Sequence, residues 1–178
     1  MFIGKTPTPV PLTSSDITDG IISTAKIADD AVTAAKASFA PGKVLQVVQG
    51  TTSTSVSSTS DTFADTGVTA NITPSSTSNK VFIMVTLCGI EKRSNCLSRH
   101  RLLKDGSQLA LYNNLSPYDA TSDRMTDQNS FNYLDSPSST SQLTYKVQYS
   151  LYPGGGSGTT LVCNNDSIST ITLLEISG

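Results

Sequence analysis

From residue 43 to the end of the chain, hydrophobic and polar residues alternate in short runs that are separated by turn residues. The clearest alternation is in Thr144–Tyr152, where Tyr145, Val147, Tyr149 and Leu151 occupy every second position. Successive side chains of a β-strand point to opposite faces of its sheet, so a period of two predicts an extended strand. This run therefore predicts an antiparallel strand with one face buried and the other in water.

The run Val81–Ile90 is the longest apolar stretch, and both of its faces are apolar. One face carries Val81, Ile83, Val85 and Leu87, and the other carries Phe82, Met84 and Cys88. Such a pattern predicts a strand that is buried on both sides. The covering partner is either a second sheet or another chain.

Further runs of the same kind predict strands at Val44–Gln49, Val68–Thr73, Cys96–Lys104, Gln108–Tyr112, Phe131–Leu134, Thr159–Cys163 and Ile168–Ile176. Asp105-Gly106 predicts the turn of a hairpin, and residues 113–129 are expected to be polar and irregular. Many short strands at this spacing are typical of an antiparallel β-sandwich or jelly roll. Residues 43–178 are therefore expected to form an all-β, jelly-roll-like head domain.

The stretch before this domain contains an internal repeat. Asp19–Lys26 recurs ten residues later as Asp29–Lys36, with Ile22 returning as Val32. A unit this short cannot bury its own apolar residues and has to stack on copies of itself, in its own chain or in neighbouring chains. Residues 16–42 are therefore expected to form a short stalk or neck, whose local structure the pattern leaves open.

Residues 1–15 are rich in proline and threonine, with prolines at positions 7, 9 and 11. Proline fixes φ and disfavours helix before it, which predicts an extended arm. The arm has apolar side chains at Phe2, Ile3, Val10 and Leu12. It either lies in a groove on another protein, with these side chains as its contacts, or is a disordered tail.

Charge and cysteine content narrow the classes of partner and compartment. The formal net charge is −2 and charged residues make up 15% of the chain, against roughly 25% in typical soluble domains. With no run of Lys or Arg, neither nucleic acid nor an anionic membrane is expected as a partner. No segment approaches the ~20 apolar residues that span a membrane, and the N-terminus lacks the features of a signal peptide. Cys88, Cys96 and Cys163 are expected to be free thiols in a protein made in a reducing cytoplasm, with one disulfide as the alternative.

No motif predicts catalysis. His100 is the single histidine, no serine is marked as its nucleophile, and we expect it at the surface or at an interface. The evenly spaced Asp119, Asp123 and Asp127 would suit a glycosidase or a calcium site, but their spacing does not match an EF-hand. We expect solvated loop charges there, and predict neither a catalytic residue nor a cofactor or metal.

Tyrosine and amide side chains gather in and beside the predicted loops. Tyrosine rings stack on apolar faces such as those of sugars, and Asn and Asp bond to hydroxyl groups. This combination indicates a glycan-contacting rim, with packing of the tyrosines under loops as the alternative. The rim would comprise Tyr112, Asn113, Asn114, Tyr118, Asp119 and Asn129.

The order of several segments resembles a known family. Residues 2–16 and the repeat at 19–36 resemble the N-terminal parts of phage tail-fibre-like proteins, especially those of phages that infect marine bacteria and cyanobacteria. Four later stretches of this chain resemble the C-terminal domains of such fibres. They are residues 63–74, 133–137, 144–147 and 169–176. The resemblance implies a virion structural protein, a homotrimer assembled in the host bacterial cytoplasm, whose partners are other virion proteins of the capsid, portal or tail.

Together these patterns predict a short trimeric appendage. Residues 1–15 anchor it to the particle, residues 16–42 form the stalk, and residues 43–178 form a head that contacts host surface glycans. The expected trimer interface comprises Ile22, Val32, Phe82 and Met84. The alternatives are a capsid decoration or cement protein that stabilises the shell and, with less support, a glycan-degrading enzyme.

Overall fold

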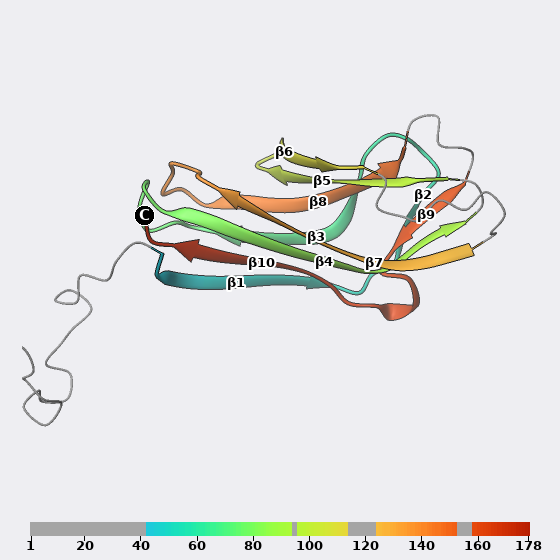
Figure 1. Cartoon of the computed structure of the whole chain (residues 1–178), viewed down its shortest axis with the longest axis horizontal. Coiled ribbons are helices and arrows are strands. Elements are labelled where there is room, and N and C mark those ends of the chain that lie inside the picture. Colours follow the sequence, from blue (N-terminus) through green and yellow to red (C-terminus); the bar gives the residue numbers. More distant parts are fainter. Residues whose placement is uncertain (1–41, 94–95, 114–123, 153–157) are drawn as a thin grey trace, which may run out of the picture. The chain divides into compact units, whose positions relative to one another are not determined.

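A computed structural model describes residues 42–93, 96–113, 124–152 and 158–178 (Figure 1). The chain divides into two units, residues 1–40 and residues 41–178. The expected arm, and the expected stalk apart from Gly42, lie outside the described residues.

The described residues form antiparallel β-strands, one short 3-10 helix and no α-helix. The strands are β1 (Val44–Thr52), β2 (Val56–Ser58), β3 (Ala64–Ile72), β4 (Lys80–Arg93), β5 (Ser98–Lys104), β6 (Ser107–Tyr112), β7 (Arg124–Asp135), β8 (Leu143–Leu151), β9 (Thr159–Val162) and β10 (Ser169–Ile176). The 3-10 helix η3 (Asn164–Asp166) lies between β9 and β10. The all-β prediction is therefore confirmed.

The strands form two sheets (Figure 1). The first sheet has the order β1-β10-β4-β9-β2, with β7 paired to the other edge of β4, and the second has the order β3-β8-β5-β6. Strand β4 organises the first sheet because it is 14 residues long. Its first half pairs with β10 and its last three residues pair with β9, while β7 runs along its other edge.

The core lies between the inner faces of the two sheets. Alternate residues of β8, namely Tyr145, Val147, Tyr149 and Leu151, are buried, as the alternation predicts. The inward residues of β4 and β10 meet them from the first sheet. They are Val81, Ile83, Val85, Leu87, Ile171 and Leu173. The antiparallel β-sandwich is thus built from the period-two pattern of the sequence.

The structure corrects two boundaries. Strand β7 begins at Arg124, so part of the segment expected to be irregular is a strand, and β2 forms within the Ser/Thr-rich segment where no strand is predicted. Both have polar residues, which weaken the hydrophobic pattern. Backbone pairing with a neighbouring strand nonetheless satisfies their N–H and C=O groups, and the polar side chains face water.

The outer face of β4 differs from the expectation of burial on both sides. Within one chain, Phe82 and Cys88 are only half-buried and Met84 is 43% exposed. The second sheet covers the face of Val81 and Ile83 alone, because a sandwich buries one face of each sheet. In the described part of the chain, neither sheet covers the outer apolar face of β4.

Glu175 is buried in β10 and clamps the segment that leads into β4. Its carboxylate accepts hydrogen bonds from the Nε2 of Gln46 at 2.6 Å, the backbone N–H of Ser75 at 2.6 Å and the Nδ2 of Asn79 at 2.5 Å. The hydroxyl of Ser75 donates another at 2.8 Å. Burial would raise the pKa of Glu175, but these bonds outweigh it and hold the pKa below its ordinary value.

We expect Glu175→Gln to lower the free energy of unfolding at pH 7 by roughly 2 kcal/mol, because the amide group turns a donor toward groups that themselves donate. Urea denaturation measures the change. Asp61→Asn removes an equal charge at an exposed position and is the control, with an expected change within about 0.5 kcal/mol. Because the pKa of Glu175 is lowered in the folded state, its contribution is present above pH 4.5 and is lost as the pH falls further. Equal stability of the two variants would contradict the clamp.

Candidate functional site

A β-bulge interrupts the pairing of β4 with β7. Leu87 pairs with Asn129 and Ile90 pairs with Asp127, so Cys88 and Gly89 together oppose one residue of β7. Gly89 has a φ of 59°, a left-handed conformation that glycine adopts without steric cost. Bulges of this kind bend a strand and redirect its side chains.

The connection between β9 and β10 packs against this bulge. A Cβ added at Gly89 would lie 2.5 Å from the backbone oxygen of Asn164 and 2.8 Å from the Cβ of Ser167. The backbone N–H of Cys163 donates to the carbonyl of Cys88 at 3.0 Å. Cys163, Asn165 and Asp166 all have positive φ, which folds the connection tightly over β4.

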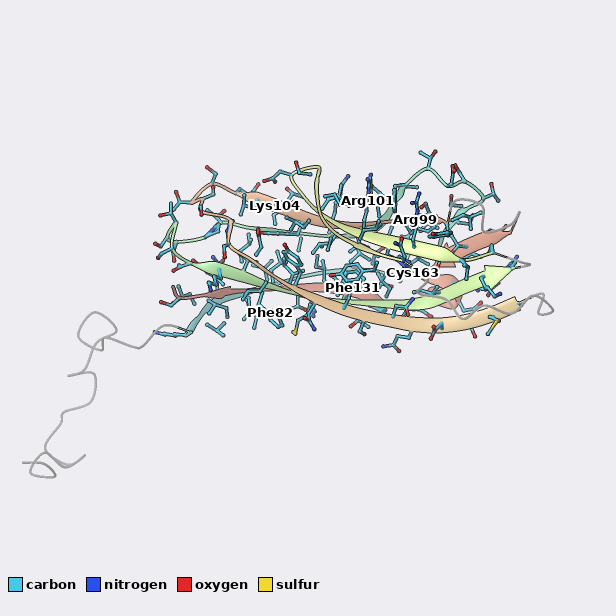
Figure 2. The ribbon with its side chains drawn as sticks, turned by 45° about the horizontal axis from the view of Figure 1, so that its top comes forward. Phe82, Arg99, Arg101, Lys104, Phe131 and Cys163 are labelled. Carbon is cyan, nitrogen blue, oxygen red and sulfur yellow. The ribbon has the colours of Figure 1, made fainter. Side chains whose placement is uncertain are left out.

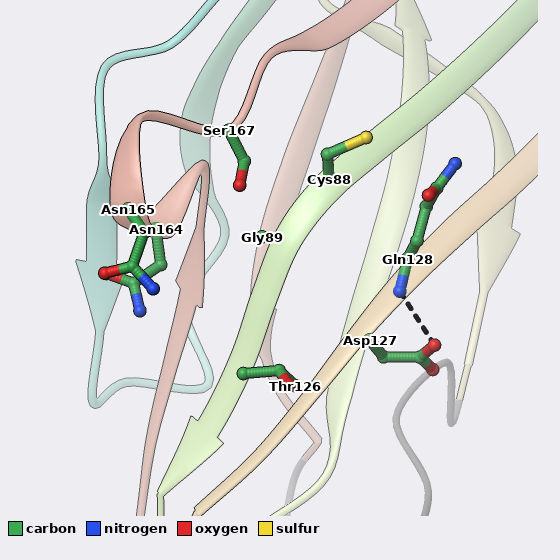
Figure 3. A pocket seen from close by; sticks show the side chains of 8 residues that line it. All are labelled: Cys88, Gly89, Thr126, Asp127, Gln128, Asn164, Asn165 and Ser167. Carbon is green, nitrogen blue, oxygen red and sulfur yellow. Dashed lines mark hydrogen bonds between the residues drawn. The ribbon is translucent and has the colours of Figure 1, made fainter.

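An open cleft of about 390 Å³ lies where the bulge, β7 and this connection meet (Figure 3). Among the residues that the structure describes, its lining carries one carboxylate, three carboxamides, two hydroxyls and one thiol. The lining residues are Cys88, Gly89, Thr126, Asp127, Gln128, Asn164, Asn165 and Ser167. Such a set offers hydrogen-bond donors and acceptors with little net charge.

Glu91 holds one wall of the cleft. It is fully buried and accepts hydrogen bonds from Arg93 at 2.5 Å, from Arg124 at 2.8 Å and from the Nδ2 of Asn164 at 2.5 Å. Burial would raise the pKa of Glu91, but the bonds and charges of Arg93 and Arg124 outweigh it and lower the pKa. The ionised carboxylate orients the side chain of Asn164, whose Oδ1 remains as a hydrogen-bond acceptor.

The residues of the expected glycan rim differ in their burial and contacts. Tyr112 stacks on Phe131 with 4.1 Å between ring centroids and donates its hydroxyl to the carbonyl of Asn132 at 3.3 Å. Asn113 is exposed just beyond β6, and Asn129 is half-buried within β7. Since Phe131 covers a face of the Tyr112 ring, this tyrosine ties the two sheets together. Three further rim residues, Asn114, Tyr118 and Asp119, lie outside the described residues.

Of the four residues expected at the trimer interface, the structure describes two. Phe82 and Met84 lie on the outer face of the first sheet (Phe82 is labelled in Figure 2). The two expected interface residues of the stalk, Ile22 and Val32, lie outside the described residues, as do the arm residues Phe2, Ile3, Val10 and Leu12.

The expectation that His100 lies at the surface or at an interface is wrong. His100 is fully buried on the core face of β5, because the strand alternation turns Arg99 and Arg101 outward instead, where their guanidinium carbons lie 4.4 Å and 4.1 Å from the ring centroid of Phe63. Within the described residues, neither ring nitrogen of His100 has a hydrogen-bond partner. Burial lowers the pKa of His100 to about 4.

Cys88, Cys96 and Cys163 are free thiols, as predicted. Of the expected loop carboxylates, Asp127 lies exposed in β7, while Asp119 and Asp123 lie outside the described residues. Within the described ranges, no three His, Cys, Asp or Glu side chains gather closely enough to hold a metal ion. The part of the chain that the structure describes has no helix long and apolar enough to cross a membrane.

Sequence reasoning missed the cleft, although one local signal marks it. A glycine inside an apolar strand pattern indicates a bulge, and Gly89 occupies such a position within Val81–Ile90. The left-handed pair Asn165-Asp166 is also of the residue types that tolerate positive φ. Neither signal indicates which distant segment the bulge would meet.

Fold and site together define an antiparallel two-sheet β-sandwich with a polar surface cleft. No protein-family model matches the chain, and no curated protein matches it. Among solved structures, the chain is similar to one described as "Structure of infectious bursal disease virus Gx strain", with 12% identity and a TM-score of 0.25. The match covers 75% of this chain and spans 40% of that chain. A TM-score this low carries no argument about fold or function.

Proposed function

We propose that this chain is a phage virion structural protein, a short trimeric fibre or appendage whose N-terminal arm anchors it to the particle and whose β-sandwich head contacts host surface glycans. The observation that carries the proposal is an apolar row on the outer face of the first sheet. The resemblance of the arm and repeat to phage tail-fibre-like proteins supports its virion setting.

The apolar row runs across four neighbouring strands. Val47 of β1 pairs with Leu174 of β10, Leu174 pairs with Phe82 of β4, and Phe82 pairs with Leu134 of β7. Directly paired residues of adjacent strands project on the same face of a sheet, so the four side chains lie in one line. Val47 is 60% exposed and Leu134 is 51% exposed, and Met84 adjoins the row along β4. Contiguous apolar surface of this kind marks an interaction site.

We propose that the occupant of this face is a second copy of the same chain. The row begins on β1, the first strand after residues 1–41. The repeat in that segment is too short to bury its apolar residues alone and requires copies of itself. Copies that associate through the repeat would therefore bring their β1 strands, and the rows that begin there, close together. Closed symmetry is the usual outcome for identical subunits.

Strand order supports assigning the sandwich to the jelly-roll class. The order β1-β10-β4-β7 in one sheet and β3-β8-β5-β6 in the other is that of eight strands in two Greek keys, with β2 and β9 as additions. Jelly rolls serve in viral capsid and lectin domains. A fold alone does not define a function, so this order supports the proposal without carrying it.

Leu134→Lys is expected to shift the assembled protein to monomers, because it places a charge in the middle of a surface that association would desolvate. Sedimentation velocity or native mass spectrometry of the full chain measures the change. Leu111→Lys is the matched control, since Leu111 is an exposed leucine of the second sheet, at 40% exposure. A monomeric wild type, or an unchanged assembly in Leu134→Lys, would refute self-association through this face.

Location on the particle separates the fibre from a capsid decoration protein. Cryo-electron microscopy of intact particles is expected to place a few copies at the tail or a vertex, whereas copies at regular sites over the shell would indicate a cement function. Deletion of residues 1–15 is expected to abolish incorporation. If the truncated protein were incorporated as before, the anchoring function of the arm would be wrong.

A further inference from the structure

We propose that the cleft between the β4 bulge, β7 and the β9–β10 connection binds a neutral saccharide unit (Figure 3). This inference rests on the proposed glycan-contacting function and assigns it to residues other than those of the expected rim. The described rim residues, Tyr112, Asn113 and Asn129, are not among the described residues that line the cleft.

The cleft offers polar groups that the described part of the fold does not use. The side chains of Thr126, Gln128, Asn165 and Ser167 line it without a hydrogen bond to any other described residue. Asp127 accepts at Oδ1 from the backbone N–H of Gln128 at 2.7 Å (dashed in Figure 3), which leaves its other oxygen as an acceptor. Hydroxyl groups both donate and accept, so neighbouring hydroxyls of a sugar match carboxamides, hydroxyls and a carboxylate together.

The charge of the lining argues against ions. The described residues that line the cleft include no Lys or Arg, and Asp127 is the one carboxylate among them, so an anionic group would meet repulsion without compensation. Calcium prefers a shell of six to eight oxygen ligands that usually includes several carboxylates. A neutral polyhydroxyl ligand fits this lining better than a phosphate, a sulfate or a cation.

The walls of the cleft are held in place before any ligand arrives. The connection is seated against Gly89, where there is no room for a Cβ, and Asn164 is oriented by the buried carboxylate of Glu91. A site whose polar groups are fixed loses less conformational entropy on binding. The volume of about 390 Å³ lies at the lower end of the roughly 300–1,000 Å³ of ligand clefts, which suits one sugar ring rather than a long oligosaccharide.

The lining residues that the structure describes include no aromatic ring, so recognition would depend on hydrogen bonds, and a single site would bind weakly. Linked copies of the head on one appendage would raise the apparent affinity through effective concentration. Weak single-site binding is therefore compatible with firm attachment to a surface that carries many sugar units.

Saturation-transfer difference NMR of the full-length chain tests the site with glucose, galactose, mannose and N-acetylglucosamine, and with glucose 6-phosphate as an alternative probe. Isothermal titration calorimetry tests Ca²⁺ as the second alternative. We expect at least one neutral sugar to bind. Asp127→Asn and Gln128→Ala are expected to weaken that binding about tenfold, the loss of one or two hydrogen bonds. Both residues are exposed on β7, and both variants should fold as the wild type does. Asp61→Asn and Gln108→Ala are matched controls at exposed positions outside the cleft and should bind as the wild type does.

Each other outcome would overturn the assignment. Sugar binding that survives both cleft variants would place the glycan site elsewhere and leave the proposed function standing. Binding of glucose 6-phosphate or Ca²⁺ in preference to neutral sugars would overturn the ligand class, and no binding by the folded protein would overturn the site. Failure of the proposed function is detected separately, by loss of self-association or by absence from particles.

Discussion

Replacing Gly89 with alanine is expected to lower the free energy of unfolding by roughly 3 kcal/mol. The left-handed conformation of Gly89 costs an L-residue about 1–2 kcal/mol, and overpacking against fixed backbone adds about 1–3 kcal/mol. The added Cβ would lie 2.5 Å from the carbonyl oxygen of Asn164 and 2.7 Å from its backbone nitrogen. Urea denaturation at one fixed protein concentration measures the change, because the proposed self-association would make stability depend on concentration.

Gly106→Ala is the matched control for Gly89→Ala. Gly106 also has positive φ, at 84°, but its added Cβ would meet no atom within 4 Å. This variant carries the backbone cost alone, and we expect it to lose about 1 kcal/mol. The difference between the two variants therefore isolates the close approach of the β9–β10 connection to the bulge. If both lost the same free energy, the connection would not be seated on Gly89.

The stability of this protein is expected to fall by roughly 2 kcal/mol between pH 7 and pH 5, and His100→Leu is expected to remove most of that loss. Burial lowers the pKa of His100 from 6.5 to about 4 in the folded state. Below pH 6.5 the unfolded chain therefore binds a proton that the folded chain does not. Stability falls as the pH drops from about 6.5 toward 4, and below that the folded state is protonated as well.

The window from pH 7 to pH 5 belongs to His100 because it is the single histidine of the chain and no other side chain ordinarily titrates there. Three carboxylates also have lowered pKa values, namely Asp65, Glu91 and Glu175. Their ordinary pKa values are 3.8 for Asp and 4.5 for Glu, so they change stability only at a lower pH than His100 does. Since neither nitrogen of His100 bonds to another described residue, leucine leaves no partner among them unsatisfied and should preserve or raise stability at pH 7.

Urea denaturation of the wild type and of His100→Leu at pH 7, 6 and 5 measures this effect. Glu175→Gln is the control, because it should lower stability at all three of these pH values while keeping the loss between pH 7 and pH 5. A wild type equally stable at pH 7 and pH 5 would show that His100 is accessible to protons in the folded state. If His100→Leu lost as much stability between pH 7 and pH 5 as the wild type does, another titratable group would be responsible for the loss.

Local sequence pattern predicted the strands well where one face is buried. The alternation in Thr144–Tyr152 gives the inward residues of β8, and Asp105-Gly106 gives the turn between β5 and β6. Both features are local, because side-chain direction in a strand and turn geometry depend on neighbouring residues alone. The same local reasoning failed for the polar start of β7, which pairing with β4 holds in place.

His100 shows where local pattern was insufficient. Residues on both faces of β5 combine polar and apolar types, so the alternation by itself does not say which face is inside. The second sheet turns the face of Leu102 and His100 to the core, and Arg99 and Arg101 remain outside against Phe63. Packing between the sheets made this choice, since it buries more apolar surface.

The sequence by itself determined an all-β chain, most of its strands, its free thiols and the apolar second face of β4. Only the tertiary structure decided which strands pair, which outer side chains align in the row from Val47 to Leu134, and where the cleft lies. The cleft joins residues 88–89, 126–128 and 164–167, which are separated by tens of positions in the chain. Their meeting depends on long-range strand register and on one bulge at Gly89, and register is set by the packing of whole sheets rather than by any local pattern.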